Sequence, residues 1–269
     1  MYDTQHTQIH HRLSEIEHRY GAGAHILADP YLLSLLARLC HPDTIQPEIN
    51  RLVDVLYRHL VGVVLAHEFP RCRVEQPTRM AAYHPEAVYA GQILDPTTRA
   101  VVVDIARAGM FPSQIVYDHL NGVLDPRTVR QDHIFMNRRS DEEGRVVGID
   151  ISGSKIGGPI DDACVLLPDP MGATAGSMIH AIDLYRDRGQ GAKFIAMHLI
   201  VTPEYLKAMR QALPEVVIYA VRLDRGLSPS AVLETVPGTH WDQERGLNQN
   251  HYIVPGGGGF GEIMNNAFV

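Results

Sequence analysis

The spacing of apolar and polar residues in the first half of the chain predicts helices that pack on short buried strands. From Ile49 to His67 apolar side chains recur every three or four positions, which predicts an amphipathic helix that covers a sheet. The β-branched run from Ala100 to Ile105 is continuous, as in a strand buried on both faces. A turn of small residues and then a helical segment to about Leu120 follow. This order indicates an α/β protein.

The second half of the chain alternates strands and helices more clearly. Its apolar runs predict three strands, at Cys164–Leu167, Lys193–Val201 and Val216–Leu223. Between them the pattern predicts two helices, Ser177–Arg188 and a second one capped by Thr202. Such alternation favours a mostly parallel sheet flanked by helices, with right-handed crossovers.

Two segments do not follow this alternation. Residues 1–25 are polar and rich in histidine, so we expect an N-terminal extension ahead of one main domain at 26–269. A short strand at His133–Met136 precedes a polar, glycine-bearing stretch at 138–159, which predicts a mobile hairpin.

Composition places the chain among ordinary globular proteins, with 45% hydrophobic and 20% charged residues. The net charge of -7 gives no general attraction to nucleic acid polymers or anionic membranes, so any phosphate must be captured locally. No apolar run approaches the roughly 20 residues of a membrane helix, and the first residues lack the apolar core of a signal peptide. We therefore expect a cytoplasmic protein. Three widely spaced cysteines fit neither a disulfide framework nor a zinc site: Cys40, Cys72 and Cys164.

Histidine and tryptophan raise two further questions. Among the fifteen histidines, His6 and His10 lie one helical turn apart and His11 is adjacent, but no acidic or cysteine partner nearby completes a ligand set. Solvated surface histidines are the better interpretation. Trp241 is the only tryptophan, and we expect it to pack.

The segment Asp169 to Ser177 is the strongest candidate for chemistry. It joins a buried strand to a helix, so its backbone N–H groups and the helix dipole can converge on a phosphate, with hydroxyl donors from Thr174 and Ser177. Asp169 would repel a phosphate and suits ribose hydroxyls or a hydrated magnesium ion. Like Arg107, it lies at the carboxyl end of a predicted strand, where parallel sheets bind ligands. An ordinary strand-to-helix turn with a surface Asp explains the same pattern from the residues alone.

Three segments resemble the uracil phosphoribosyltransferases. Asp169-Pro-Met-Gly-Ala-Thr-Ala-Gly-Ser177 is similar to the family's Asp-Pro-Met-Leu-Ala-Thr-Gly-Gly-Ser loop. Ala106-Arg-Ala-Gly109 is similar to Leu-Arg-Ala-Gly. Near the carboxyl end, Gly246-Leu-Asn248 and Tyr252-Ile-Val-Pro-Gly-Gly-Gly-Gly-Phe-Gly-Glu262 follow the family's Gly-Leu-Asn and Tyr-Ile-(Val/Ile)-Pro-Gly-Leu-Gly-Asp-Ala-Gly-Asp. The resemblance runs from about Asp29 to the end.

The resemblance implies a phosphoribosyltransferase-like fold with a hairpin lid, and transfer of a phosphoribosyl group from phosphoribosyl diphosphate to uracil. The implied catalytic residues are Arg107, Arg138 and Asp169. The implied donor-binding residues are those two arginines and Asp169, Pro170, Met171, Gly172, Ala173, Thr174, Ala175, Gly176 and Ser177. A base-binding segment at about 224–269 would contact the base through Ile253, Gly258, Gly259 and Phe260.

The resemblance also implies partners and a mechanism. Mg²⁺ would be carried by the diphosphate, with no direct protein ligand, and the protein would form a homodimer or a larger homo-oligomer. A base nitrogen displaces diphosphate through an oxocarbenium-like state, so no protein nucleophile is required. The hairpin at 138–159 would exclude water. A solvated charge at Arg138 and a merely flexible glycine-rich turn near Gly258 are the alternatives for those two features.

Four departures from the family pattern affect these expectations. Gly259 replaces the family Asp. Ala175 replaces a Gly, at a cost of about 1 kcal/mol if the position needs a positive φ. Gly172 replaces a Leu and would loosen the loop. An insertion between Leu223 and Gly246 has no evident physical account. Three functions therefore stay open: transfer to uracil, transfer to a different base, and a non-catalytic relative that senses a nucleotide.

Overall fold

The computed structural model describes residues 4–140, 146–191 and 193–267. Within them, eight strands form one sheet in the order β1-β10-β9-β7-β4-β5-β6, with β8 beside β9. These strands are β1 (Ala24–Ile26), β4 (Ala100–Ala106), β5 (Val129–Ser140), β6 (Val146–Lys155), β7 (Cys164–Pro168), β8 (Met171–Gly172), β9 (Lys193–Val201) and β10 (Val217–Leu223). All these pairings are parallel except β5 with β6. The predicted mostly parallel sheet is confirmed.

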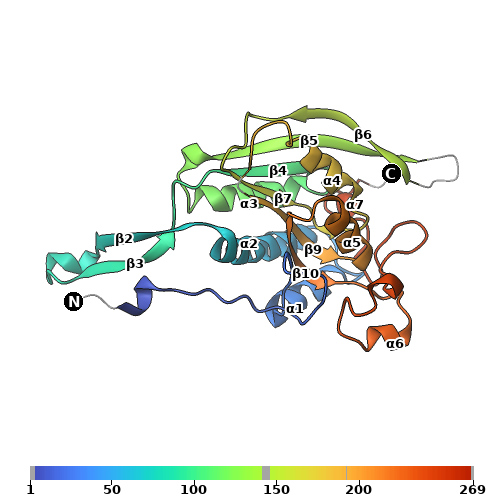
Figure 1. Cartoon of the computed structure of the whole chain (residues 1–269), viewed down its shortest axis with the longest axis horizontal. Helices are drawn as coiled ribbons and strands as arrows, with labels where there is room; N and C mark the ends of the chain where they lie inside the picture. The colour runs from blue at the N-terminus through green and yellow to red at the C-terminus, as the bar shows by residue number, and fades with distance from the viewer. Residues whose placement is uncertain (1–3, 141–145, 192, 268–269) are drawn as a thin grey trace.

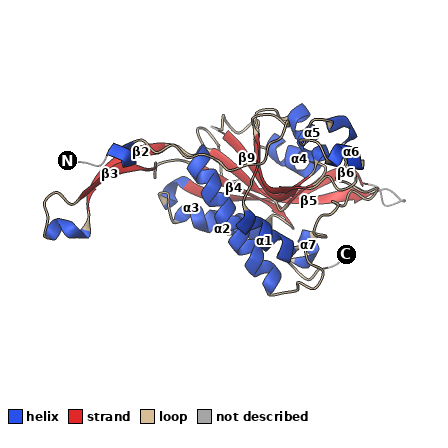
Figure 2. Ribbon diagram, turned by 90° about the horizontal axis from the view of Figure 1, so that it is seen from below, coloured by secondary structure: helices blue, strands red, loops and turns tan. Residues whose placement is uncertain are grey.

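Helices cover both faces of the sheet (Figure 2). The helices are α1 (Pro30–Leu39), α2 (Glu48–Glu68), α3 (Met110–Asn121), α4 (Gly176–Asp183), α5 (Pro203–Ala212), α6 (Ser230–Leu233) and α7 (Phe260–Ile263). Short 3-10 turns are η1 (Thr4–Thr7), η2 (Arg79–Ala82), η3 (Pro126–Thr128) and η4 (Trp241–Gln243). Val102 and Leu166 pack with α1, α2 and α3, whereas their neighbours Val101 and Val165 pack with α4 and α5. Successive strand residues point to opposite faces, so both faces must be apolar.

The predicted elements of the core are confirmed, with one correction. α2, β4, α3, β7, β9 and β10 lie where the apolar pattern placed them. The helix predicted at Ser177–Arg188 ends at Asp183, because the chain then continues in tighter turns in which Tyr185 bonds back to Ile182 and Arg188 to Tyr185. Tyr185 is fully buried and donates to Asp132 at 2.9 Å. That buried contact turns the chain away from the helix axis.

The predicted hairpin exists but is longer than the sequence indicated. Its arms are β5 and β6, so the short strand expected at His133–Met136 is the middle of a strand that starts at Val129. Residues 141–145, which belong to the predicted lid, lie outside the described residues. Whether the hairpin moves stays a prediction.

A second, two-stranded sheet was not predicted. β2 (Arg71–Pro77) and β3 (Val88–Leu94) pair antiparallel and project away from the main sheet (Figure 1). Most residues of β2 are exposed and most of β3 are half-buried, and Tyr83 in the connection is 78% exposed. An exposed hairpin has no strong apolar periodicity, so its pattern was weak.

The end of the predicted N-terminal extension packs against the main domain. β1 joins the edge of the sheet beside β10, and Tyr20 is only 1% exposed. The hydroxyl of Tyr20 donates to Glu244 at 2.5 Å, within the insertion that the sequence left unexplained. Residues from Leu13 to Ala28 thus contribute to the packing of the main domain.

The insertion is organised around a buried ion pair. Arg225 donates to Glu244 at 2.9 Å and also to the carbonyls of Val232, Leu233 and Thr235. Trp241 packs edge-on against Tyr20, as its predicted packing role requires, and its indole donates to a backbone carbonyl. The insertion is therefore a folded element.

The remaining sequence expectations concern thiols and membranes. Cys40, Cys72 and Cys164 are free, as expected. In the described part of the chain, no helix combines the length and the apolar character that crossing a bilayer requires.

Candidate active site

A cavity of about 820 Å³ opens where β4 and β7 end. These two strands are neighbours, but the chain proceeds from β4 to β5 on one side and reaches β7 on the other. Ligands of open parallel sheets bind at such a switch in strand order. The cavity is lined by most of the predicted site: Arg107, Asp169, Met171, Ala173, Thr174, Ala175, Gly176, Ser177, Ile253, Gly258, Gly259 and Phe260.

Three predicted site residues do not line the described cavity. Pro170 and Gly172 belong to the same loop, but both residues are buried and do not line the cavity. The side chain of Arg138 lies outside the described part of the structure, although its backbone belongs to β5. The binding roles of all the predicted residues stay predictions.

Arg107 follows the last residue of β4 and enters the turn before α3. The turn is tight: a Cβ at Gly109 would lie 2.8 Å from the carbonyl oxygen of Ile105 and 3.1 Å from that of Pro168. Glycine is needed here so that the β4 turn can approach the end of β7. The Arg107 guanidinium is half-buried and donates to the carbonyl of Ala267 at 2.8 Å. Among the residues the structure describes, this contact uses one guanidinium donor of Arg107, so the other donors of the fork can meet an anion.

Asp169 is the first residue after β7. Its backbone N–H donates to Met197 at 3.0 Å, and its carboxylate accepts from the N–H of Met171 at 3.2 Å. The half-buried side chain lines the cavity. The backbone of Asp169 is thus tied to β9, and its carboxylate is held by the N–H of Met171 at the edge of the sheet.

A buried pair that the sequence reasoning missed supports Asp169 from below. Nδ1 of His198 lies 2.6 Å from the carbonyl oxygen of Asp169, and Nε2 lies 2.6 Å from the hydroxyl of Tyr205. A carbonyl only accepts, so Nδ1 carries the hydrogen and Nε2 accepts from Tyr205. Burial lowers the pKa of His198 to about 4, so the ring is neutral at pH 7. A lone histidine inside the apolar run of β9 was the available signal.

The phosphate-type loop ends at Ala175, which has a left-handed backbone with φ 68°. The expected cost of an alanine at a positive φ therefore applies. α4 begins at the next residue, so the unpaired N–H groups of its first turn lie at the cavity. The predicted turn from strand to helix is present, and its role in binding phosphate stays a prediction.

The expectation that Gly172 loosens the loop is wrong. Gly172 is in β8 and is buried, and a Cβ there would lie 2.8 Å from Cγ1 of Val201 and 3.2 Å from the ring of Tyr205. The volume of the family's leucine is therefore occupied by neighbouring side chains. The loop is packed at this position.

The carboxyl-terminal segment is held over the cavity by a buried ion pair. Arg222, near the end of β10, donates to Asp224 at 2.6 and 2.7 Å and to the carbonyl of Gly256 at 2.9 Å. Asp224 in turn accepts from the N–H of Gly256 at 2.8 Å. Gly256 has φ 63°, and a Cβ there would overlap the carbonyl of Ile253. The turn that presents residues 253–260 is thus fixed to the sheet.

The two ends of the cavity differ in character. Phe260 is 1% exposed and packs in the core, so it provides a wall of the cavity and no open face for stacking. Phe135 is 45% exposed and, with Met136 and Ser152, brings the base of the β5–β6 hairpin to the opposite side. Glu262, in the first turn of α7, adds a carboxylate that the sequence reasoning did not single out.

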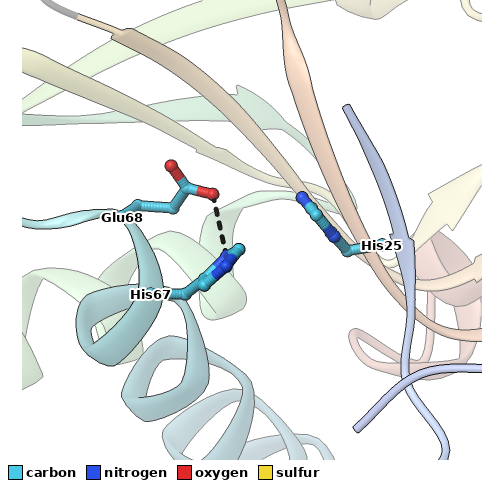
Figure 3. A group of neighbouring side chains, drawn as sticks. All are labelled: His25, His67 and Glu68. Atoms are coloured by element: carbon cyan, nitrogen blue, oxygen red, sulfur yellow. Dashed lines mark ion pairs between the residues drawn. The ribbon is translucent and has the colours of Figure 1, made fainter. Parts of the chain in front are cut away.

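A group of metal-type ligands lies away from this cavity. Ligand atoms of His25, in β1, and of His67 and Glu68, at the end of α2, come within 4.8 Å of one another (Figure 3). The carboxylate of Glu68 already accepts from Lys193 and from Tyr219, and these contacts lower its pKa despite burial. The neighbouring hydrogen bonds account for the group without an ion.

Comparison with known proteins identifies the fold and the family. The sequence model described as uracil phosphoribosyltransferase matches residues 26–240. The chain belongs to the uracil phosphoribosyltransferase family. A uracil phosphoribosyltransferase of Ligilactobacillus salivarius (strain UCC118) is 30% identical over 176 residues, which span 62% of this chain and 65% of that relative. The family match ends at residue 240, before the predicted base-contact residues.

Two solved structures share the fold. The AQ2163 protein from Aquifex aeolicus superposes with a TM-score of 0.69 at 21% identity, over 91% of this chain and 99% of that one. Adenine phosphoribosyl transferase from Trypanosoma brucei, solved with AMP, pyrophosphate and ribose-5-phosphate, gives 0.50 at 12% identity, over 79% and 87%. At these identities the two structures show that the fold is shared.

Proposed function

We propose that this chain is an enzyme that transfers a phosphoribosyl group from phosphoribosyl diphosphate to uracil, with UMP and diphosphate as products. One observation carries the proposal. A cavity at the strand ends is lined together by Arg107, by Asp169, by the first turn of α4 and by the glycine-rich segment at 253–260. Membership of the uracil phosphoribosyltransferase family supports the same reaction.

Each part of the cavity suits one part of the donor. The 5-phosphate binds at the first turn of α4, where N–H groups and the hydroxyls of Thr174 and Ser177 converge. Arg107 forks onto the diphosphate oxygens, because a guanidinium matches their geometry and stays charged. Asp169 accepts from the ribose hydroxyls. The backbone of Ile253 and Gly258 pairs with the base edge.

The reaction then requires that the base and the donor be held in position and that the charge of the leaving diphosphate be neutralised. A base nitrogen forms a bond to the anomeric carbon as the bond from that carbon to the diphosphate oxygen breaks, and the electron pair of the broken bond leaves with the diphosphate. The N–H proton of the base passes to bulk water, so no protein base is required. Negative charge develops on the diphosphate, where Arg107 stabilises it. Exclusion of water from the anomeric carbon prevents hydrolysis, and the hairpin residues Phe135 and Met136 lie where a cover would close.

Magnesium fits this site through the donor. Carboxylate oxygen is a ligand that Mg²⁺ accepts, and Asp169 presents one at the cavity edge, within reach of a hydrated ion held by the diphosphate. When bound, the ion would neutralise diphosphate charge.

Transfer to a different base is the second candidate. The observation that favours it is the absence of a side chain at Gly259, which lines the cavity in the predicted base segment. A missing side chain changes both the volume and the hydrogen-bonding groups that meet a base.

The test is diphosphate release from phosphoribosyl diphosphate and Mg²⁺ with a panel of purine and pyrimidine bases. We expect release with uracil to exceed release with every other base. Faster release with another base establishes the second candidate. Tight donor binding without release for any base contradicts both and favours a nucleotide sensor.

A further inference from the structure

The space beside Gly259 is occupied by the side chain of Glu262. A Cβ built on Gly259 would overlap the Glu262 carboxylate, whose Cδ lies 2.8 Å from it. The two residues are joined by a hydrogen bond from the N–H of Glu262 to the carbonyl of Gly259 at 3.0 Å, at the start of α7. This turn folds the glutamate back over the glycine. Both residues line the cavity.

The Glu262 carboxylate is available to a ligand. The side chain is half-buried, and no hydrogen-bond or ion-pair partner for its carboxylate occurs among the residues the structure describes. A carboxylate that lines a cavity with unused acceptor sites can accept hydrogen bonds from a ligand. The neighbouring groups at 258 and 259 are glycines, so they offer backbone only.

The family pattern has carboxylates at both of these positions, whereas this chain has glycine at 259 and the longer glutamate at 262. The extra methylene lets the carboxylate at 262 reach the place vacated at 259. The carboxylate of Glu262 therefore lies where a side chain at position 259 would begin.

We propose that Glu262 determines base specificity by accepting a hydrogen bond from an N–H group of a pyrimidine-type base. The inference rests on the proposed function and deepens it. A carboxylate accepts and does not donate, so it favours a base edge with an N–H and disfavours one with a carbonyl at the same place.

A helix-capping role is the structural alternative. Glu262 is the third residue of α7, a position from which glutamate often stabilises the first turn. Capping would affect stability and would leave base affinity unchanged once the protein is folded. A capping role therefore predicts a change in stability, and a specificity role predicts a change in base affinity.

The first experiment uses the full chain with Glu262→Gln and Glu262→Ala, and Glu234→Gln as a control at an exposed carboxylate. Uracil affinity is measured by calorimetry in the presence of ribose 5-phosphate, diphosphate and Mg²⁺. KM for uracil, Kd for phosphoribosyl diphosphate and Tm are measured alongside. We expect Glu262→Gln to weaken uracil affinity and raise KM about 10- to 100-fold, as for a lost charge-assisted hydrogen bond, with donor Kd within twofold. Unchanged uracil affinity, or an equal loss in donor affinity, overturns the inference.

The second experiment exploits the overlap at position 259. Gly259→Asp alone places a side chain against Glu262, so we expect at least a tenfold loss of uracil affinity. Gly259→Asp combined with Glu262→Ala removes the overlap and restores a carboxylate, so we expect most of that loss to be recovered. A double variant no better than Gly259→Asp overturns the inference.

The two experiments separate this inference from the proposed function. A wild-type chain that binds uracil with the expected dependence on Glu262, yet releases no diphosphate, contradicts the enzymatic function alone. A chain that transfers to uracil without any effect of Glu262 contradicts the inference alone. A chain that neither binds nor uses uracil contradicts both.

Discussion

Tyr205 and His198 form a buried hydrogen bond of 2.6 Å beneath the strand end that carries Asp169. The other ring nitrogen of His198 holds the Asp169 carbonyl at 2.6 Å, so a helix residue and a strand residue together fix the backbone of the candidate catalytic loop. The ring of Tyr205 also packs against Gly172. The position of the loop that begins at Asp169 thus depends on His198 and Tyr205, although neither residue is predicted to contact a ligand.

Tyr205→Phe removes the donor to His198 and leaves a buried acceptor unpaired. We expect a loss of about 1–3 kcal/mol in the free energy of unfolding, measured by urea denaturation. Tyr31→Phe is a matched control, because Tyr31 is 54% exposed. Equal stability of the two variants would argue against the pair.

Stability should fall on acidification through His198. Its pKa is lowered to about 4 by burial, against 6.5 for an ordinary histidine, so the unfolded chain binds more protons between these values. This contribution to stability is complete above pH 6.5 and is lost as pH falls towards 4, by up to roughly 3 kcal/mol. Denaturation as a function of pH should show a shallower acid slope in His198→Asn, which retains a donor for the carbonyl. Parallel slopes would contradict a buried neutral ring.

Ala175→Gly should stabilise the protein. Ala175 has φ 68°, where a Cβ costs about 1 kcal/mol or more, partly offset by the greater freedom of glycine in the unfolded chain. We expect a gain of about 0.5–1 kcal/mol in the free energy of unfolding. Ala173→Gly is the control, because Ala173 is similarly buried but is absent from the positive-φ residues, and it should lose stability.

Gly172→Leu introduces the family residue into occupied space. The new side chain would meet Val201 and Tyr205, so we expect a loss of about 1–3 kcal/mol from overpacking. A second substitution, Tyr205→Ala, should reduce the penalty of the leucine by opening that space. Purely additive losses in a double-mutant cycle would mean that the two positions do not compete.

Asp169→Asn should abolish most turnover without unfolding the loop. The amide oxygen still accepts from Met171, but the negative charge that suits ribose hydroxyls or hydrated magnesium is lost. We expect at least a hundredfold lower kcat, roughly 3 kcal/mol, with Tm close to that of the wild type. Asp187→Asn, at an exposed carboxylate, is the control. Wild-type turnover and magnesium dependence in Asp169→Asn would remove this carboxylate from the chemistry.

The folding of the insertion between Leu223 and Gly246 should depend on the side chain of Glu244. This carboxylate is 1% exposed and bonds Tyr20, Arg225 and the N–H of Gly238. Glu244→Ala leaves Arg225 buried without its partner, so we expect a loss of about 3–5 kcal/mol measured by thermal or urea unfolding. A loss below 1 kcal/mol would indicate that the insertion is not part of the cooperative unit.

The sequence by itself determined the sheet and the edge at which the site lies. Short, largely apolar runs at Ala100–Ile105, Cys164–Leu167 and Lys193–Val201 are typical of strands buried on both faces, and their alternation with helices favours a parallel sheet. Arg107 and Asp169 follow two of these strands, so local order in the chain was enough to place both at the carboxyl edge of the sheet, whereas the pairing of β4 with β7 that makes them neighbours came from the fold. The loop at 169–177 was also predicted from adjacent residues, and so was the cost of Ala175 if its position needs a positive φ.

Tertiary structure alone decided what fills the space around those residues. His198 with Tyr205, Arg222 with Gly256, and Tyr20 with Glu244 join elements whose spacing carries no periodic signal. The position of the Glu262 carboxylate, in the predicted base-binding segment, was likewise decided by the tertiary structure. The sequence shows glycine at 259 and glutamate at 262, but only the turn into α7 brings the second side chain over the first. Side-chain positions depend on backbone direction and on neighbours distant in the chain, and apolar spacing contains neither.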